Sequence, residues 1–257
     1  MDETEILRRV DDERRGLARD GETIERLPAV TRLCGAGGGY RMVSWSVLAD
    51  DTADAAIAAE VDHHRRLGAA FEWKVYSHDG PPDLRDRLAR HGFEVGPCEA
   101  VLAYDLSDAP APWQEDAGHG TVVVVDRPEL VDVFRRTAES AFGRDYGPTA
   151  GQLAAALAAG STQHRGYVAY AGDGAPAAVG RLYTHPRSAF AGLYGGGTVP
   201  AHRGRGLYRA VVAARARDAA AAGARYLIVD ALPTSRPILE RLGFRRVADT
   251  WPCEWRP

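Results

Sequence analysis

The segment best suited to ligand binding is residues 199–208, which read Val-Pro-Ala-His-Arg-Gly-Arg-Gly-Leu-Tyr. Gly204 and Gly206 lack side chains where successive backbone N–H groups would converge on an anion. Arg203 and Arg205 add positive charge, and a helix beginning near Gly206 would add the positive end of its dipole. This combination predicts a loop that holds a pyrophosphate.

The spacing excludes two familiar phosphate loops. A P-loop requires a lysine after its second glycine, and the only lysine of the chain is Lys74, in the other half. The dinucleotide fingerprint requires a third glycine three positions after Gly206, where Arg209 stands. The loop instead resembles the acyl-CoA loop of the GNAT acetyltransferase superfamily, Gln/Arg-x-x-Gly-x-Gly/Ala, with Gly204 and Gly206 at its glycines and Ala201 at its first position.

The elements around the loop support this resemblance. Residues 188–198 are expected to form a strand that ends in a glycine run, where a backbone bulges or admits a ligand. A helix is expected over residues 206–222, a short buried strand over 226–230 and a short helix between Pro237 and Gly243. In GNAT proteins this order of elements forms the cofactor half of the fold.

An internal repeat indicates two related halves. Residues 54–95 contain a helix, a strand-like run, a turn with prolines and a second helix ending in Gly-Phe, and residues 207–247 repeat that order. We therefore expect an α/β fold, of the α+β mixed-sheet type, with two GNAT-like halves in tandem and a complete GNAT fold in the second. The expected parts are a degenerate domain over residues 1–106, a linker over 107–120 and a GNAT acetyltransferase domain over 121–257.

The two halves differ at the loop. Where the second half has Arg-Gly-Arg-Gly, the first has residues 49–54, Ala-Asp-Asp-Thr-Ala-Asp, with adjacent acidic residues and no glycine. This sequence would repel a pyrophosphate, so we expect the first half not to bind acyl-CoA. Completing the sheet, forming a wall of the acceptor cleft and serving as an interface remain open as its roles.

The resemblance implies acetyl-CoA as co-substrate and a set of residues that bind it. Backbone N–H groups from Arg203 to Gly206 would take the pyrophosphate, and the backbone of Val199 would pair with the pantetheine arm. The expected acetyl-CoA-binding residues are Thr198, Val199, Arg203, Gly204, Arg205, Gly206, Leu207, Tyr208 and Ser235.

Three residues are candidates for catalysis: Tyr194, Tyr208 and Asp230. The tyrosines are acceptable acids by their ordinary pKa, and Asp230 ends the buried strand beside the expected cleft. The alternatives are packing of both tyrosines with satisfied hydroxyls, capping of the following helix by Asp230, and deprotonation through water. Two positions depart from the family, since Leu239 stands at the usual tyrosine and Leu232 at the usual asparagine.

Three further residues, Glu139, Asp145 and Tyr146, stand where the segment that often borders the acceptor in this family begins. Each is a candidate for binding an ammonium group, and a solvated helix end is the alternative fate of these side chains.

Composition narrows the class of protein. The 257 residues carry a net charge of −3, which argues against nucleic-acid and anionic-membrane partners, and no apolar run is long enough to span a bilayer. Cys34, Cys98 and Cys253 are odd in number and widely spaced, which favours a cytoplasmic location, and no metal-binding spacing occurs. Lys74 is the only lysine among 32 basic residues, a bias typical of a GC-rich bacterial source.

The sequence thus predicts an N-acetyltransferase that transfers an acetyl group from acetyl-CoA to a primary amine in a direct ternary complex. The acceptor would be a small-molecule amine or a peptide. A non-catalytic acyl-CoA sensor and an assembly module are the alternatives, and exposed sheet edges favour a possible homodimer.

Overall fold

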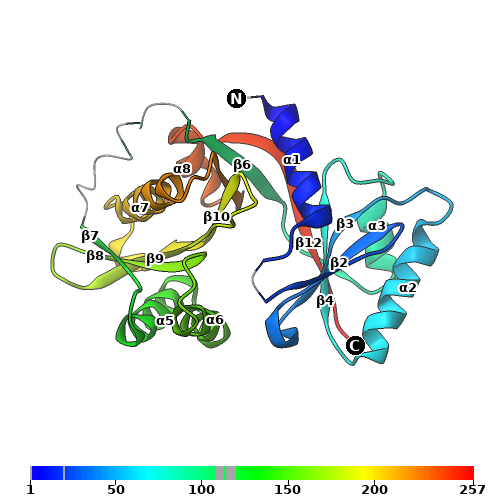
Figure 1. Cartoon of the computed structure of the whole chain (residues 1–257), viewed down its shortest axis with the longest axis horizontal. Helices are drawn as coiled ribbons and strands as arrows, with labels where there is room; N and C mark the ends of the chain where they lie inside the picture. Colours follow the sequence, from blue (N-terminus) through cyan, green and yellow to red (C-terminus); the bar gives the residue numbers. More distant parts are fainter. Residues whose placement is uncertain (1, 20, 108–110, 112, 114–119) are drawn as a thin grey trace. The chain divides into compact units, whose positions relative to one another are not determined.

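The computed structural model describes residues 2–19, 21–107, 111, 113 and 120–257 of the chain (Figure 1). It divides into two compact units: the first comprises residues 1–103 and 230–257, and the second residues 104–229. This division differs from the expected one, in which residues 121–257 formed a single domain. The expected linker at 107–120 lies mostly outside the described residues.

The first unit contains strands ordered β1-β2-β3-β4-β12-β6, with β5 paired to β12. Strands β3 and β4 are parallel, and the other pairs are antiparallel. The strands are β1 (Thr23–Arg26), β2 (Val30–Cys34), β3 (Arg41–Ser46), β4 (Phe71–Tyr76), β5 (Glu94–Val95), β6 (Glu99–Asp105, whose last two residues belong to the second unit) and β12 (Arg245–Trp255). The helices are α1 (Glu3–Gly16), α2 (Ala53–Arg66), α3 (Leu84–Arg90) and α8 (Arg236–Arg241), with a 3-10 turn at Ala36–Gly38.

Strand β12 explains why residues 230–257 belong to the first unit. Its beginning pairs with β6, from Arg245 opposite Ala103, and its end pairs with β4, where Trp255 lies opposite Phe71. The last strand of the sequence is therefore built into the sheet of the first half.

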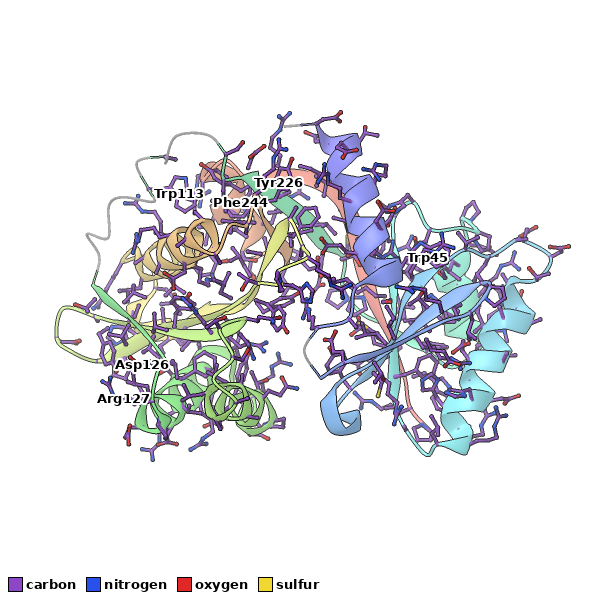
Figure 2. The ribbon with its side chains drawn as sticks, in the orientation of Figure 1. Trp45, Trp113, Asp126, Arg127, Tyr226 and Phe244 are labelled. Carbon is purple, nitrogen blue, oxygen red and sulfur yellow. The ribbon has the colours of Figure 1, made fainter. Side chains whose placement is uncertain are left out.

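Alternation along β4 separates the two faces of this sheet. Phe71, Trp73 and Val75 are buried in a core shared with α2 and α3. Helix α1 lies against β3 and β12, and the Arg15 guanidinium lies 4.7 Å from the centre of the Trp45 ring (Figure 2).

The second unit contains strands ordered β11-β10-β9-β8-β7, of which only the β10–β11 pair is parallel. The strands are β7 (Thr121–Val124), β8 (His164–Tyr170), β9 (Pro176–Tyr183), β10 (Phe190–Thr198) and β11 (Tyr226–Ala231, whose last two residues belong to the first unit). The helices are α5 (Pro128–Phe142), α6 (Gly147–Ala158) and α7 (Leu207–Ala221), with a 3-10 turn at Pro200–His202. Helices α5 and α6 cover one face of the sheet and α7 the other (Figure 1).

Local sequence accounts for the ends of these helices. Helix α5 begins at Pro128, whose fixed φ suits a first turn, directly after the Asp126–Arg127 ion pair (Figure 2). It ends at Gly143, whose φ of 67° is the left-handed conformation that glycine adopts without steric cost. The mixed α/β fold and the expected elements of the second half are confirmed, with small shifts at their ends.

Candidate functional site

The glycine run of β10 forms a bulge. Tyr194 lies opposite Arg181 of β9, but the next pair joins Gly197 to Val179, so two residues of β10, Gly195 and Gly196, stand against the single Gly180 of β9. Gly195 has a φ of 53°, which a side chain would strain. The bulge expected from the glycine run is therefore present.

Strands β10 and β11 separate near this bulge. Their parallel pairing extends only from Phe190–Tyr226 to Gly192–Ile228, whereas β10 continues to Thr198. The far half of β10 therefore has one edge that is not paired to β11, and the loop expected to bind the anion follows directly.

The loop presents several backbone N–H groups without acceptors. Among the described residues, no acceptor is found for the N–H groups of Gly204, Arg205 and Gly206, and no side chain caps α7. Gly204 and Gly206 adopt φ values of 75° and 77°. The N–H groups of the first turn, including those of Leu207 and Tyr208, also lack intrahelical partners, which is the usual state of a helix beginning.

Polar atoms around the loop also remain unpaired. The Oγ1 atom of Thr198 and the Nδ1 atom of His202 are buried without a hydrogen-bond partner among the described residues. The side chains of Arg203 and Arg205 are exposed, and Nε of Arg203 donates to the Thr198 carbonyl at 3.2 Å. The loop therefore has the charge and the donors that an anionic ligand needs.

The backbone groups of Val199 have partners within the protein. The N–H of Val199 donates to the Ala177 carbonyl at 2.8 Å, and the Val199 carbonyl accepts from the N–H of His202 at 2.9 Å. Both groups are engaged within the protein, so the expected pairing of Val199 with a pantetheine arm would compete with these contacts. Because adjacent residues of a strand direct their backbone groups to opposite edges, the N–H of Thr198 points away from β9.

Tyr208 lies under the bulge, on the side covered by α7. A Cβ atom at Gly196 would lie 2.9 Å from Cε2 of Tyr208 and 3.2 Å from Nη2 of Arg215. Burial raises the pKa of Tyr208, and the Arg215 guanidinium, which is hydrogen-bonded to the phenol, opposes that shift. A protonated phenol thus stands beside the part of β10 that has left β11.

Two further candidate tyrosines lie nearby, Tyr194 on β10 and Tyr146 directly before α6. The ring of Tyr194 folds back over Gly192, where a Cβ would lie 2.5 Å from its Cε2. Tyr146 stacks on Phe142, and its hydroxyl would lie 3.3 Å from a Cβ at Gly195.

Two acidic groups on this side are already engaged. Glu139 pairs with Arg135 at 2.9 Å, and Asp145 accepts the N–H of Gly147 at 2.8 Å. Their expected role in binding an ammonium group would compete with these contacts.

Asp230 and Ser235 belong to the first unit. Asp230 pairs with Nζ of Lys74 at 3.1 Å, and Glu99 pairs with the same Nζ at 3.0 Å. Burial disfavours the charged form of Lys74, but these carboxylates outweigh it and raise the lysine pKa. The residue at the start of α8 is Ser235, whose hydroxyl donates to the Leu232 carbonyl, so Asp230 does not cap that helix.

The first unit contains a counterpart of the strand separation. Parallel pairing of β3 and β4 covers only Met42–Glu72 and Val43–Trp73. Beyond it, Nε of Arg14 donates to the Ser44 carbonyl at 2.9 Å and Nη2 reaches the Lys74 carbonyl at 3.5 Å. A side chain of α1 therefore spans the two strands where they separate.

Side chains of the first unit form ion pairs at the beginning of α2. Arg87 of α3 donates to the Asp50 carbonyl at 2.9 Å and pairs with carboxylates on Asp50, Asp54 and Asp83. An ion-pair cluster thus stands where a phosphate loop would require open N–H groups.

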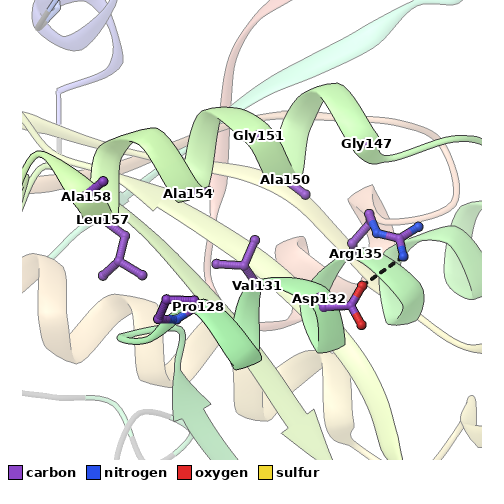
Figure 3. A pocket seen from close by; sticks show the side chains of 10 residues that line it. All are labelled: Pro128, Val131, Asp132, Arg135, Gly147, Ala150, Gly151, Ala154, Leu157 and Ala158. Carbon is purple, nitrogen blue, oxygen red and sulfur yellow. Dashed lines mark hydrogen bonds and ion pairs between the residues drawn. The ribbon is translucent and has the colours of Figure 1, made fainter.

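A separate groove of about 400 Å³ lies between α5 and α6 (Figure 3). Its lining is small and apolar apart from the Asp132–Arg135 ion pair, which spans 2.8 Å. None of the residues expected to act in catalysis or acetyl-CoA binding lines it. Within the described part of the chain, no group of three or more His, Cys, Asp or Glu residues could hold a metal ion, and no helix is long and apolar enough to cross a membrane.

Two residues of these regions were not expected from the sequence, Arg14 and Arg215. Arg215 follows Val211 by four positions on the apolar side of an Ala-rich helix, and an arginine at such a position is the signal that could have revealed it. Arg14 carried no comparable signal, since α1 has arginines on several sides.

Comparisons with known proteins give similarity in structure but not in sequence. No protein-family model and no curated protein matches the sequence. A GCN5-related N-acetyltransferase from Kribbella flavida aligns over 99% of this chain and 94% of its own, at a TM-score of 0.67 and 15% identity. A GCN5-related N-acetyltransferase from Sphaerobacter thermophilus aligns over 99% of this chain and 92% of its own, at a TM-score of 0.58 and 13% identity. A tandem GNAT protein from the clavulanic acid biosynthesis pathway aligns over 93% of this chain and 85% of its own, at a TM-score of 0.57 and 14% identity.

Proposed function

Because the chain has the fold of the GNAT N-acetyltransferases, we propose that its second unit binds acetyl-CoA and transfers the acetyl group to a primary amine. The observation that carries the proposal is the set of open N–H groups at residues 204–206, directly after a bulged strand that has separated from its parallel neighbour. The acceptor would be a small molecule or a peptide.

The residues present fit acetyl-CoA. The N–H groups of Gly204 to Gly206 and the beginning of α7 would hold the pyrophosphate, with Arg203 and Arg205 beside it. The N–H of Thr198, on the unpaired edge of β10, would take the pantetheine arm in place of Val199. The buried Oγ1 of Thr198 and Nδ1 of His202 lack partners among the described residues, and a polar ligand would satisfy them.

Acetyl-CoA supplies an activated thioester, and the chain must stabilise an oxyanion and protonate a leaving thiolate. We assign the N–H groups of the bulge, at Gly195 and Gly196, to the oxyanion. Tyr208 is the acid, since its ring lies 2.9 Å from the Cβ position of Gly196 in the bulge, and burial, which raises its pKa, keeps the phenol protonated. Tyr194 is the second candidate acid. Asp230 would have to act while paired with Lys74, so we assign deprotonation of the amine to water.

The first unit is proposed to contribute no acyl-CoA site. Arg14 spans its separated strands, and Arg87 with its carboxylates covers the beginning of α2. One acetyl-CoA per chain is therefore expected.

The test is calorimetric titration of acetyl-CoA into the wild-type protein and the Gly204→Glu variant. A carboxylate within about 4 Å of the pyrophosphate costs several kcal/mol, so affinity should fall by about 100-fold or more. The matched control is Gly160→Glu, because Gly160 also has a positive φ, of 66°, with nothing within 4 Å of its Cβ position. The control should bind like the wild type.

Turnover then separates an enzyme from an acyl-CoA sensor. Release of free CoA thiol would be followed against polyamines, aminoglycosides, amino acids and peptides with free N-termini. Binding with turnover of one amine class supports the proposal. Binding without turnover across the panel would favour a sensor, and absence of binding would refute acetyl transfer and leave an assembly module.

A further inference from the structure

Arg215 is a buried cation that has no carboxylate partner among the residues that the structure describes. Its side chain is among the largest that are fully buried, in the middle of α7. Among the described residues, no carboxylate lies within ion-pair distance of its guanidinium. Burying a charge without an opposite charge costs folding free energy, so packing alone does not explain an arginine at this position.

The guanidinium holds the two strands together where the bulge interrupts their ladder. Nη1 donates to the Arg181 carbonyl of β9 at 3.2 Å and lies 3.5 Å from the Tyr194 carbonyl of β10, while Nε donates to the Val211 carbonyl at 3.2 Å. Glycines make room for it, because a Cβ at Gly180 would lie 2.9 Å from Cζ of Arg215. Arg215 therefore fixes the strand segment that precedes the bulge.

The same guanidinium contacts the phenol of Tyr208. Burial lowers the pKa of Arg215, while the neighbouring oxygens of Tyr208 and Tyr167 favour its charged form. The groups that face this pair are Tyr167 from β8, which donates to Asp218 at 2.6 Å, and Arg181 from β9. Arg215 is the charged residue that acts on Tyr208.

We propose that Arg215 is a positioning residue for acetyl transfer, holding the β10 bulge in place and stabilising the Tyr208 phenolate that forms when the phenol gives up its proton. The Tyr208 phenolate that forms during the reaction would thus be the anionic partner of Arg215. This inference rests on the proposed function of the second unit.

The step balances without a further reagent. The amine nitrogen forms a bond to the acetyl carbonyl carbon and loses a proton to water. As the C–S bond then breaks, sulfur takes the electron pair and Oη of Tyr208 donates its proton to that sulfur. The phenolate, stabilised by Arg215, then recovers a proton from the water that received the amine proton. Arg215 remains protonated throughout and contributes only charge and hydrogen bonds.

The first experiment replaces Tyr208 with a ring-fluorinated tyrosine, whose more acidic phenol titrates while the protein is folded, and follows it by fluorine NMR. Arg215→Gln should raise the titration midpoint by about one pH unit, which corresponds to about 1.4 kcal/mol. Arg215→Lys, which keeps the charge, should raise it by less. The control is Arg217→Gln, an exposed position on the same helix, which should leave the midpoint unchanged.

A shift below about 0.2 pH unit in Arg215→Gln, or equal shifts in the Gln and Lys variants, would overturn the electrostatic role. A purely structural arginine would not distinguish charge-keeping from charge-removing variants.

The second measurement needs no Arg215 variant. It therefore tests the inference even when the Arg215 variants do not fold. Acetyl-CoA is added to the fluorinated protein at concentrations that calorimetry shows to be saturating. The resonance of residue 208 should move, since the phenol faces the ligand. Calorimetric binding with no change in the resonance would refute the acid role of Tyr208 and with it this inference. No calorimetric binding would refute the proposed function, while the titration would still report on the Arg215–Tyr208 contact.

Discussion

Arg14 is predicted to be essential for the stability of the first unit. Its guanidinium donates to both carboxylate oxygens of Asp79, at 2.7 and 3.2 Å, and to the Ser44 carbonyl at 2.9 Å. It also lies 3.7 Å from the centre of the Tyr76 ring. The Arg14→Met variant keeps most of the aliphatic length and removes all of these polar contacts.

The expected loss follows from burial. The side chains of Arg14 and Asp79 are 7% and 4% exposed, so the variant leaves a buried carboxylate whose remaining donor, among the residues that the structure describes, is the N–H of Tyr76. Removing one partner of a buried pair costs about 3–5 kcal/mol, a large share of the 5–15 kcal/mol that is typical of a whole domain. Adding Asp79→Asn should recover part of the loss, because no buried charge is then left unpaired.

Urea unfolding followed by tryptophan fluorescence measures this loss. Four of the five tryptophans belong to the first unit, so the background variant Trp113→Phe makes the signal specific to it. Arg8→Met is the matched control on the same helix, since Arg8 is exposed and should leave the transition unchanged. A loss below about 1 kcal/mol for Arg14→Met, or no recovery on adding Asp79→Asn, would refute the reasoning.

Two further predictions concern packing and pH. Gly197→Ala should destabilise the second unit by about 1–3 kcal/mol in thermal unfolding, because its Cβ would lie 2.5 Å from Cζ of Phe142, and Phe142→Leu should relieve the clash. Burial opposes the charged form of Asp11, but hydrogen bonds from His78 and Arg14 outweigh it and lower the carboxyl pKa. The stability that Asp11 provides is therefore present above its unfolded pKa of about 3.9 and lost as pH falls through the lower folded value. Acid unfolding of Asp11→Asn should show a shallower dependence on pH in that range; an identical curve would contradict the prediction.

Local patterns predicted the elements of the second half because their signals are local. The glycine run of β10, and Pro237 and Gly243 at the two ends of the short helix α8, act through φ values and steric space that depend on adjacent residues. The loop at Gly204 and Gly206 was predicted for the same reason, since its left-handed φ values are a property of two residues.

The boundary between the units could not be predicted in this way. The sequence of residues 245–255 does not indicate which strand they pair with. In the structure they pair with β4, which brings together residues as distant in the sequence as Trp255 and Phe71. The expected domain over residues 121–257 grouped this segment with its sequence neighbours, but in the structure it pairs with β6 on one side and β4 on the other.

The sequence by itself determined the fold class, the left-handed glycines of the loop at residues 203–206 and the lack of a comparable loop in the first half, because glycine spacing and charge are local properties. Tertiary structure decided the direction of each backbone N–H and the partner of each buried charge. It engaged Val199 with β9, paired Asp230 with Lys74, placed Arg14 across the separated strands of the first unit and set Arg215 beneath the bulge. These contacts join groups distant in sequence, and their energies depend on burial that only the folded chain creates.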